Sequence, residues 1–142
     1  EDPDFWEETE GEVRFSKGLK RLLNEKVCLD NFTLSSDGQG SLPIINEKKE
    51  FVGIGIGKST CLIKAIKECL LKEEIPLEIA LRAITCNPAK ILKLRNKGKI
   101  QKNHDADLVI LDQSLDVDYV FAKGKMMVEN KKPIVLGVFE GK

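Results

Sequence analysis

The sequence has little of what marks membrane, nucleic-acid-binding and metal-binding proteins. It has no apolar run near the roughly 20 residues of a membrane helix, so we expect no membrane partner. Its 23 Lys and Arg residues equal its 23 Asp and Glu residues, which excludes a whole-chain field that attracts nucleic acid. Its single histidine, His104, cannot build a histidine-rich zinc site, and we expect it in a surface turn. Any partner must therefore be recognised by a local site.

The sequence also lacks paired cysteines and a secretory start. None of its four cysteines forms a Cys-x-x-Cys pair, and three lie in apolar or strand-like stretches. We therefore expect reduced, structural thiols at Cys28, Cys61, Cys69 and Cys86. The acidic start, with Phe5 and Trp6, is interpreted as a solvated linker or a remnant of a longer loop. It is unlike a signal peptide, so a cytoplasmic location is expected. Since the chain begins at Glu1 without Met, we expect it to be part of a longer polypeptide.

What is present is a modest hydrophobic content with clear helical periodicity. With 142 residues, 42% of them hydrophobic, the chain can form one domain or parts of two. Leu19, Leu22 and Leu23 recur at helical spacing, so we predict a helix from Ser16, as N-cap, to near Lys26. Further helices are predicted from Ser59 to near Lys72, from Pro76 through Ile84, and from an Asn87 N-cap through Pro88 to Gly98.

Strand-like segments lie on both sides of these helices. Residues 27–34 are rich in β-formers and precede the turn cluster 35–41, which predicts a strand that ends in a functional loop. A composition shift near Gly98 marks a predicted domain boundary. Beyond it, a β-meander is predicted with strands over 106–112, 119–121, 125–128 and 134–136, and turns at 123–124 and 129–130.

Residues 53–60 resemble a phosphate-binding loop, but their first glycine is one position away from where that motif requires it. The template G-x-x-x-x-G-K-[ST] requires glycine where the sequence has Val52. No acidic strand end follows to hold Mg²⁺. We interpret the segment as a flexible glycine hinge before a helix. The six basic residues from Lys90 to Lys102 have no interleaved aromatics, which favours a solvated helix face and loop over a nucleic-acid surface.

Asp37 is the strongest candidate for chemistry. It follows a predicted strand and lies in a glycine-flanked loop, where α/β barrels carry ligands and bases. An aspartate before glycine is also a common turn residue. Ser35, Ser36 and Ser41 equally suit turn or cap hydroxyls. The sequence has no G-x-S-x-G motif and no histidine near these serines, which disfavours a serine nucleophile.

Motifs from about Phe15 to Glu140 give the sequence a family resemblance. They are TLSSDGQGS at 33–41, PLEIAL at 76–81, TCNPA at 85–89, KGKI at 97–100, DADLVILD at 105–112 and the ending GVFE at 137–140. Together they resemble the isoaspartyl dipeptidases, bacterial β-aspartyl peptidases of the metal-dependent amidohydrolase superfamily. DADLVILD is shared by many amidohydrolases, whereas the SSDGxGS loop narrows the resemblance to the dipeptidases.

The resemblance implies an α/β fold and a zinc-dependent hydrolase. Residues 1–98 would be the last unit or two of a (β/α)8 TIM-type barrel, and residues 99–142 the C-terminal strands of a small β-sandwich domain. By motif, Asp37 matches the aspartate that touches the metal and acts as general base, and Ser41 matches a substrate-binding serine. The implied reaction is hydrolysis of isoaspartyl dipeptides with two zinc ions, by an enzyme that we expect to be a homo-oligomer.

The sequence also departs from the family. The His-x-His pair, the bridging lysine, the two later metal histidines and the substrate-binding arginines have no counterpart, and Asn103 stands where a turn glycine is usual. One carboxylate cannot hold two zinc ions, so we expect this chain alone to be inactive. Its exposed strand edges predict partial misfolding, oligomers or aggregation. The alternatives are another amidohydrolase, of dihydropyrimidinase or deacetylase type, or a non-catalytic α/β module for assembly or nucleotide binding.

Overall fold

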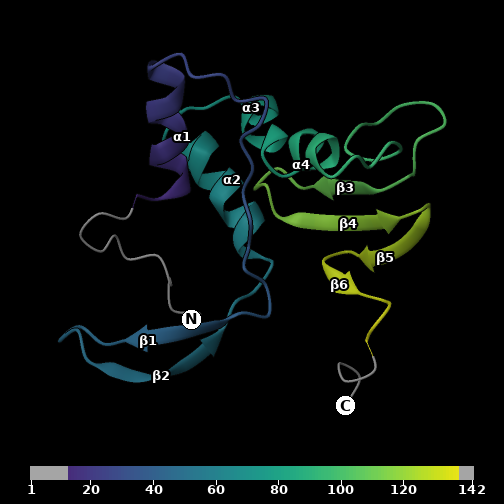
Figure 1. The fold of residues 1–142 in the computed structure, drawn as a ribbon. Coiled ribbons are helices and arrows are strands. Elements are labelled where there is room, and N and C mark those ends of the chain that lie inside the picture. The colour runs from purple at the N-terminus through teal and green to yellow at the C-terminus, as the bar shows by residue number, and fades with distance from the viewer. Residues whose placement is uncertain (1–12, 138–142) are drawn as a thin grey trace. The chain divides into compact units, whose positions relative to one another are not determined.

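The computed structural model describes residues 13–137, which belong to two compact units (Figure 1). The first unit ends at Ile84 and the second begins at Thr85. The predicted linker with Phe5 and Trp6, and the ending after Gly137, lie outside the described residues. The domain boundary near Gly98 concerns the domains of a whole enzyme and stays a prediction. No helix within 13–137 combines the length and the apolar character that a membrane crossing needs.

The fold is mixed α/β, as predicted, with one hairpin between the first and second helices and four strands after the last helix. The elements are α1 (Phe15–Asn24), β1 (Ser41–Ile45), β2 (Phe51–Ile56), α2 (Cys61–Leu71), α3 (Leu77–Arg82), α4 (Cys86–Ile91), β3 (Leu108–Leu111), β4 (Val117–Ala122), β5 (Lys125–Glu129) and β6 (Lys132–Pro133). The predicted helices over 16–26, 59–72 and 76–84 are confirmed as α1, α2 and α3.

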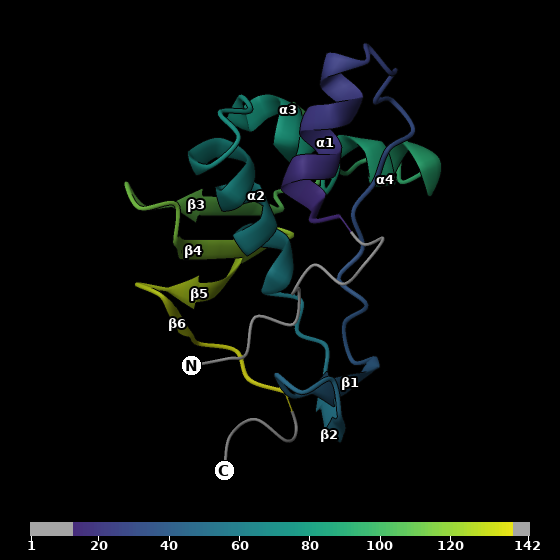
Figure 2. The same ribbon diagram turned by 90° about the vertical axis from the view of Figure 1, so that its left-hand side faces the viewer.

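The core of the first unit lies between α1, α2 and α3, and α1 and α2 lie side by side (Figure 1, Figure 2). Leu19 of α1 and Ile66 of α2 are each 1% exposed, because the apolar stripes of the two helices face each other. Ser16 is not the N-cap: Arg14 holds that place, and Ser16 is buried inside the first turn. The ring of Phe15 stacks on Phe32 with centroids 5.7 Å apart.

The predicted strand over 27–34 does not form. The segment runs without regular strand pairing, although the Leu34 N–H donates to the Ala83 carbonyl at 3.0 Å and Leu29 is buried in the core. A strand requires a hydrogen-bonded ladder with a neighbour, and no described strand lies beside this segment. The residues of this segment therefore favour a strand, but no described strand is available to pair with them.

The structure instead forms a hairpin that the sequence analysis missed. β1 and β2 pair antiparallel, with Pro43 opposite Ile54. The turn is organised by Asn46, whose side-chain oxygen accepts hydrogen bonds from the N–H groups of Lys48 and Glu50 at 2.9 and 3.0 Å. The predicted flexible glycine hinge is thus wrong, because Gly53 and its glycine neighbours lie in a paired strand.

The second unit begins with α4, which is shorter than predicted. Its N-cap is Thr85, whereas Asn87 is buried within the helix, and the helix ends at Ile91 rather than at Gly98. Gly98 has a different role. It has φ +80°, and a Cβ at this position would lie 2.7 Å from the Cβ of Ala89, so only glycine fits against α4.

The predicted meander is confirmed as a four-stranded antiparallel sheet in the order β3-β4-β5-β6. Lys123 and Gly124 form one turn and Asn130 and Lys131 another, each with positive φ at both residues, which suits tight hairpins. Because the second turn reverses the chain at once, β6 occupies residues 132–133 and the strand predicted over 134–136 is misplaced. Asn103 has φ +66°, which explains why glycine suits this position.

Candidate functional site around Asp37

Asp37 lies in a tight loop just before β1, with φ +46°. Its N–H group donates to Ser35 Oγ at 3.4 Å, and the Gly38 N–H donates to Ser36 Oγ at 3.1 Å. The Asp37 carbonyl accepts the N–H of Gly40 at 2.9 Å. The turn roles considered for Ser35 and Ser36 are therefore confirmed. Asp37 is exposed, and its left-handed backbone is one that aspartate tolerates.

Backbone hydrogen bonds tie this loop to the end of β2. The Gln39 N–H donates to the Gly57 carbonyl, and the Gly57 N–H donates to the Gly40 carbonyl, both at 2.9 Å. A Cβ at Gly57 would lie 2.5 Å from the Asp37 carbonyl oxygen, and one at Gly40 would lie 2.9 Å from Asp37 Oδ2. Glycine is therefore required at both positions for the loop to close.

Ser41, the predicted substrate-binding residue, opens β1 and pairs with Ile56. It is exposed, as Asp37 is, and the loop of residues 37–41 places both residues at the base of the hairpin. Their roles in catalysis and substrate binding stay predictions. The anchoring glycine, Gly57, was missed as part of this site, although its place at the end of a glycine-rich run was the available signal.

A hollow of about 620 Å³ adjoins this loop within the first unit. Its wall is mostly apolar and comes from α1, the segment 32–35 and α2, including Phe15, Leu22, Phe32, Leu34 and Cys61. The Cys61 thiol donates to the Ser36 carbonyl at 3.8 Å, and burial raises the pKa of this thiol. Such a wall suits apolar groups of a ligand or of further polypeptide. In the sequence, the only sign of this apolar wall was the helical spacing of the leucines in α1.

The described residues do not by themselves fit the predicted pair of zinc ions. Within residues 13–137, no three His, Cys, Asp or Glu side chains are grouped to hold a metal ion. Asp37 supplies one carboxylate, whereas catalytic zinc sites use about three protein ligands. His104 is half-buried in a turn, and its Nδ1 has no hydrogen-bond partner among the described residues. The prediction of zinc therefore stays a prediction for a longer enzyme.

Gly53 to Thr60 does not form a phosphate cradle. Gly53 pairs with Ile44 in the hairpin ladder, and Lys58 follows β2 before α2 begins at Cys61. The backbone amides of the glycines are thus placed by a strand rather than by a loop around an anion.

The acids of the DADLVILD motif stabilise the second unit. Lys97 bonds Asp107 and, at 2.9 Å, Asp105, and the Lys123 N–H donates to Asp107 at 2.7 Å. The hydrogen bond to Asp107 and then that to Asp105 raise the pKa of Lys97. The basic segment around Lys97 also lines a cavity of about 230 Å³ with Lys90, Lys93, Arg95 and Lys99. The motif therefore holds a loop in place, and no chemistry needs to be assigned to it.

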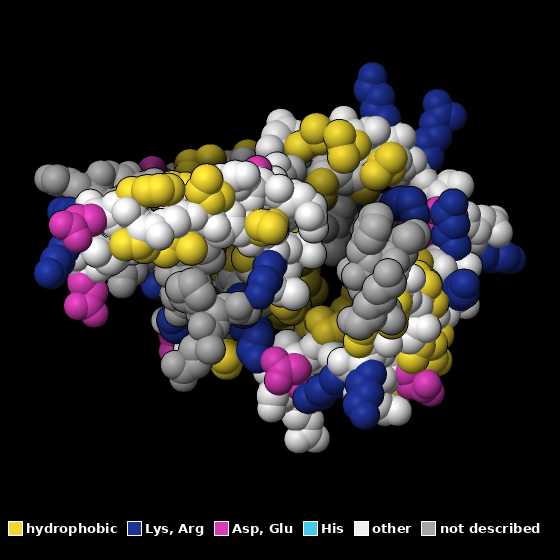
Figure 3. Space-filling model, turned by 90° about the horizontal axis from the view of Figure 1, so that it is seen from below, with side chains coloured by type: hydrophobic (Ala, Val, Ile, Leu, Met, Phe, Trp, Pro, Cys, Tyr) yellow, Lys and Arg dark blue, Asp and Glu magenta, His cyan; other side chains and the backbone are white. Residues whose placement is uncertain are grey.

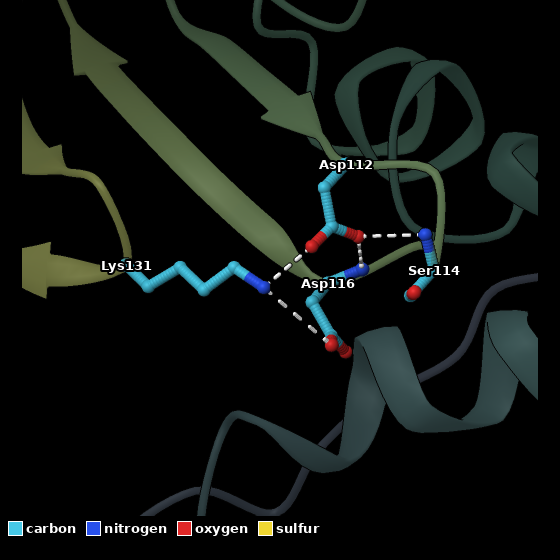
Figure 4. Close-up of polar contacts among 4 residues, drawn as sticks. All are labelled: Asp112, Ser114, Asp116 and Lys131. Carbon is cyan, nitrogen blue, oxygen red and sulfur yellow. Dashed lines mark hydrogen bonds and ion pairs between the residues drawn. The ribbon is translucent and has the colours of Figure 1, made fainter.

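Asp112, the last residue of that motif, organises the β3–β4 turn (Figure 4). One of its oxygens accepts the N–H groups of Ser114 and Asp116 at 2.8 and 2.9 Å, and the other accepts Lys131 Nζ. The hydrogen bond from Lys131 holds the pKa of Asp112 below its ordinary value and raises the pKa of Lys131. One carboxylate thus joins the β3–β4 turn to the β5–β6 turn.

The four cysteines are free. Cys69 is fully buried, as expected of a structural thiol, whereas Cys28 is exposed and does not belong to the core. The expectation of a structural role is therefore wrong for Cys28.

Comparison with known proteins relates most of the chain to one family. A model of the amidohydrolase family matches residues 14–129. The crystal structure of a β-aspartyl dipeptidase from Fervidobacterium islandicum AW-1, in complex with β-Asp-Leu dipeptide, has a TM-score of 0.73 and 35% identity, covering 87% of this chain and 32% of that chain. This likeness confirms the predicted resemblance to the isoaspartyl dipeptidases.

Two dihydroorotases are similar over shorter stretches or at lower identity. That of Carboxydothermus hydrogenoformans is 41% identical over 59 residues, which are 42% of this chain and 14% of that protein. That of Methanosphaera stadtmanae is 28% identical over 112 residues, which are 75% of this chain and 24% of that protein. The chain thus spans about a third or less of the length of these proteins.

Proposed function

This chain belongs to the amidohydrolase family, and we propose that it is the C-terminal part of a zinc-dependent isoaspartyl dipeptidase. The observation that carries the proposal is the similarity to the Fervidobacterium islandicum dipeptidase, which extends over most of this chain. The SSDGxGS loop, residues 35–41, supports the same choice among amidohydrolases. The substrate proposed is a dipeptide whose first residue is linked through its β-carboxyl group.

The proposed architecture is the last unit or two of a (β/α)8 barrel up to residue 98, followed by β-sandwich strands. In chain order, segment 27–34 follows α1 and is separated from α2 by the β1–β2 hairpin; it would supply one barrel strand between two helices, although its residues 30–31 form a turn in this structure. The segment has no ladder partner among the described strands, and the apolar hollow beside it offers room where a neighbouring barrel strand would pack. Exposed Val109 and Ile110 in β3 supply apolar surface for further sandwich strands.

Asp37 and Ser41 carry the proposed chemistry of this part of the enzyme. A carboxylate at the mouth of the barrel can accept a proton from the attacking water and deliver it to the leaving amine. The exposure of Asp37 leaves it reachable by substrate, and the hydrogen bonds of Gly57 hold its loop in place. The other zinc ligands would come from residues outside 13–137.

The test uses the longer polypeptide, loaded with zinc. Its upstream sequence is expected to encode a His-x-His pair and a barrel lysine, and the protein is expected to hydrolyse β-Asp-Leu. Asp37→Asn should lower kcat by a factor of about 10² to 10⁴, the range for loss of a general base, and Ser41→Ala should mainly raise KM. Asp118→Asn is the matched control. Absence of β-Asp-Leu hydrolysis, or full activity of Asp37→Asn, contradicts the proposal.

A second candidate is a cyclic-amide hydrolase, favoured by the local similarity to a dihydroorotase. Ring-opening of a cyclic amide and cleavage of a dipeptide need the same attack on an amide carbonyl, so Asp37 would serve both. A substrate panel of β-aspartyl dipeptides, cyclic amides and N-acetyl sugars, compared by kcat/KM, separates them. A cyclic amide or an N-acetyl sugar preferred over β-Asp-Leu would overturn the dipeptidase proposal.

A further inference from the structure

We propose that Ser36 and Cys61 are positioning residues for Asp37, and that they fix the orientation of the two peptide units on either side of its Cα. The inference rests on the proposed function, in which Asp37 accepts and delivers the proton, and it deepens that function by naming the residues that hold this carboxylate in place. Each of the two residues acts through Asp37 rather than on the substrate.

The peptide unit before Asp37 is hydrogen-bonded at both ends. Its carbonyl, which belongs to Ser36, accepts the thiol of Cys61 at 3.8 Å. Its N–H, which belongs to Asp37, donates to Ser35 Oγ at 3.4 Å. The carbonyl and the N–H of one peptide unit point in opposite directions, so rotation of this unit would break both bonds.

The peptide unit after Asp37 is held in the same way. Its N–H, which belongs to Gly38, donates to Ser36 Oγ at 3.1 Å. Its carbonyl, which belongs to Asp37, accepts the N–H of Gly40 at 2.9 Å. Ser36 therefore bonds both units, the first through its backbone carbonyl and the second through its side chain.

These bonds matter because Asp37 has φ +46°, a conformation that is unfavourable for a residue with a Cβ unless its surroundings hold it. Rotation of the unit before Asp37 would change this φ and turn the side chain in another direction. A general base must lie within hydrogen-bond reach of the proton that it removes. The conformation held by Ser36 and Cys61 is therefore the one in which Asp37 acts.

Cys61 also links the loop to the core of the first unit. It is the first residue of α2, and Ile66 of the same helix is buried in that core. The hairpin holds the loop through Gly57, but Ile54 and Ile56 are 67% and 63% exposed, and Figure 3 shows hydrophobic side chains along the hairpin at the left. The hairpin cannot by itself fix the loop relative to the core, and the contact from α2 supplies that link.

The test measures kcat and KM in the longer polypeptide, loaded with zinc, on whichever amide of the substrate panel it hydrolyses fastest. Ser36→Ala should lower kcat about threefold to tenfold, the effect of one modest hydrogen bond, with KM little changed. Ser36→Thr keeps the hydroxyl and should keep the activity. Ser114→Ala, in an exposed turn of the second unit, is the matched control.

A double-mutant cycle separates positioning from a general loss of stability. In the Asp37→Asn background, Ser36→Ala and Cys61→Ala should each change kcat about twofold or less, because no base remains to be positioned. Cys61→Ala also keeps the inference testable if Ser36→Ala does not fold. A loss of kcat that persists undiminished in the Asp37→Asn background, or full activity of both alanine variants, overturns the positioning roles.

Crystal structures of the longer polypeptide give a second measurement that does not depend on activity. Asp37 should keep its positive φ in Ser36→Thr and should occupy more than one conformation in Ser36→Ala and in Cys61→Ala. A single unchanged conformation of Asp37 in both alanine variants overturns the inference. Full activity of Asp37→Asn would instead contradict the proposed function, and the crystal structures would still decide whether Ser36 and Cys61 hold the Asp37 loop.

Discussion

The backbone N–H of Gly57 donates a hydrogen bond of 2.9 Å to the carbonyl oxygen of Gly40, joining the end of β2 to the loop of Asp37. This hydrogen bond couples the conformation of the Asp37 loop to the pairing of the hairpin. A loop with a non-glycine residue at positive φ needs such bonds, because the conformation is unfavourable in a free chain. Substitutions at the end of β2 are therefore expected to alter the conformation of the Asp37 loop.

Gly57→Ala should displace the Asp37 loop. The new Cβ would lie 2.5 Å from the Asp37 carbonyl oxygen, and overpacking of this kind costs about 1–3 kcal/mol of unfolding free energy. Gly53→Ala is the control, because its Cβ would meet Ile44 Cδ1 at 4.0 Å, an ordinary contact. Urea unfolding and the amide NMR signal of Asp37 measure both effects. Equal behaviour of the two variants would contradict this account.

Glu68→Gln should destabilise the first unit in a pH-dependent way. Burial pushes the pKa of Glu68 upward, but the hydrogen bonds and charges of Lys72 and Arg14 outweigh it and bring the pKa below its ordinary 4.5. The lowered pKa means that the ionised carboxylate stabilises the fold above about pH 4.5, and that this stabilisation disappears as pH falls through the lowered value. We expect a difference of about 1 kcal/mol or less at pH 7, typical of part-exposed ion pairs.

Denaturant unfolding of wild type and Glu68→Gln between pH 7 and pH 3 measures this difference. Exposed Glu47→Gln is the matched control and should follow the wild type. A gap between wild type and Glu68→Gln that grows on acidification would show that the ion pairs with Lys72 and Arg14 are not its source.

The cysteines should differ in their rate of reaction with a thiol reagent. Burial, and then the charges of Glu68 and Glu73, raise the pKa of the Cys69 thiol to about 11, and the side chain is 0% exposed. At pH 8, Cys69 should therefore react only when the chain unfolds, whereas exposed Cys28 should react at once. Alkylation followed by peptide mass spectrometry measures each rate. Rapid labelling of Cys69 in folded protein would exclude the packing of α2 described above.

Asp112→Ala should loosen the β3–β4 turn and its link to the β5–β6 turn. It removes the acceptor for the N–H groups of Ser114 and Asp116 and the partner of Lys131. Amide hydrogen exchange at Ser114 and Asp116 should become faster. In the wild type the pKa of Asp112 is lowered by Lys131, so the same loosening is expected when acidification protonates this carboxylate. Asp118→Asn is the control, and unchanged exchange in Asp112→Ala would count against the role of this carboxylate.

The predictions from sequence succeeded where a local pattern is sufficient for an element to form. The leucines of α1 and the apolar stripe of α2 repeat at the helical period, and each helix makes its hydrogen bonds within itself. The tight turn at Lys123-Gly124 depends on residues that tolerate positive φ, which the sequence displays. The errors at Ser16 and Asn87 concern helix ends, where burial rather than capping decides.

The predictions failed where an element depends on a distant partner. Residues 27–34 have the propensity of a strand but no described neighbour to pair with, while the glycine-rich β2 forms because β1 pairs with it. Asp37 was identified from its motif. Its left-handed backbone and its contact with Gly57 follow from the closure of the hairpin, which no local pattern indicates.

The amino-acid sequence by itself determined the first three helices, the meander with its Lys123-Gly124 turn, and the family, because these depend on short-range periodicity and on motifs that are read directly. Only the tertiary structure decided that β1 pairs with β2, that Gly57 supports the Asp37 loop, and that the acids of DADLVILD hold turns. Those features depend on residues distant in sequence meeting in space, and strand pairing and side-chain ion pairs exist only once they have met.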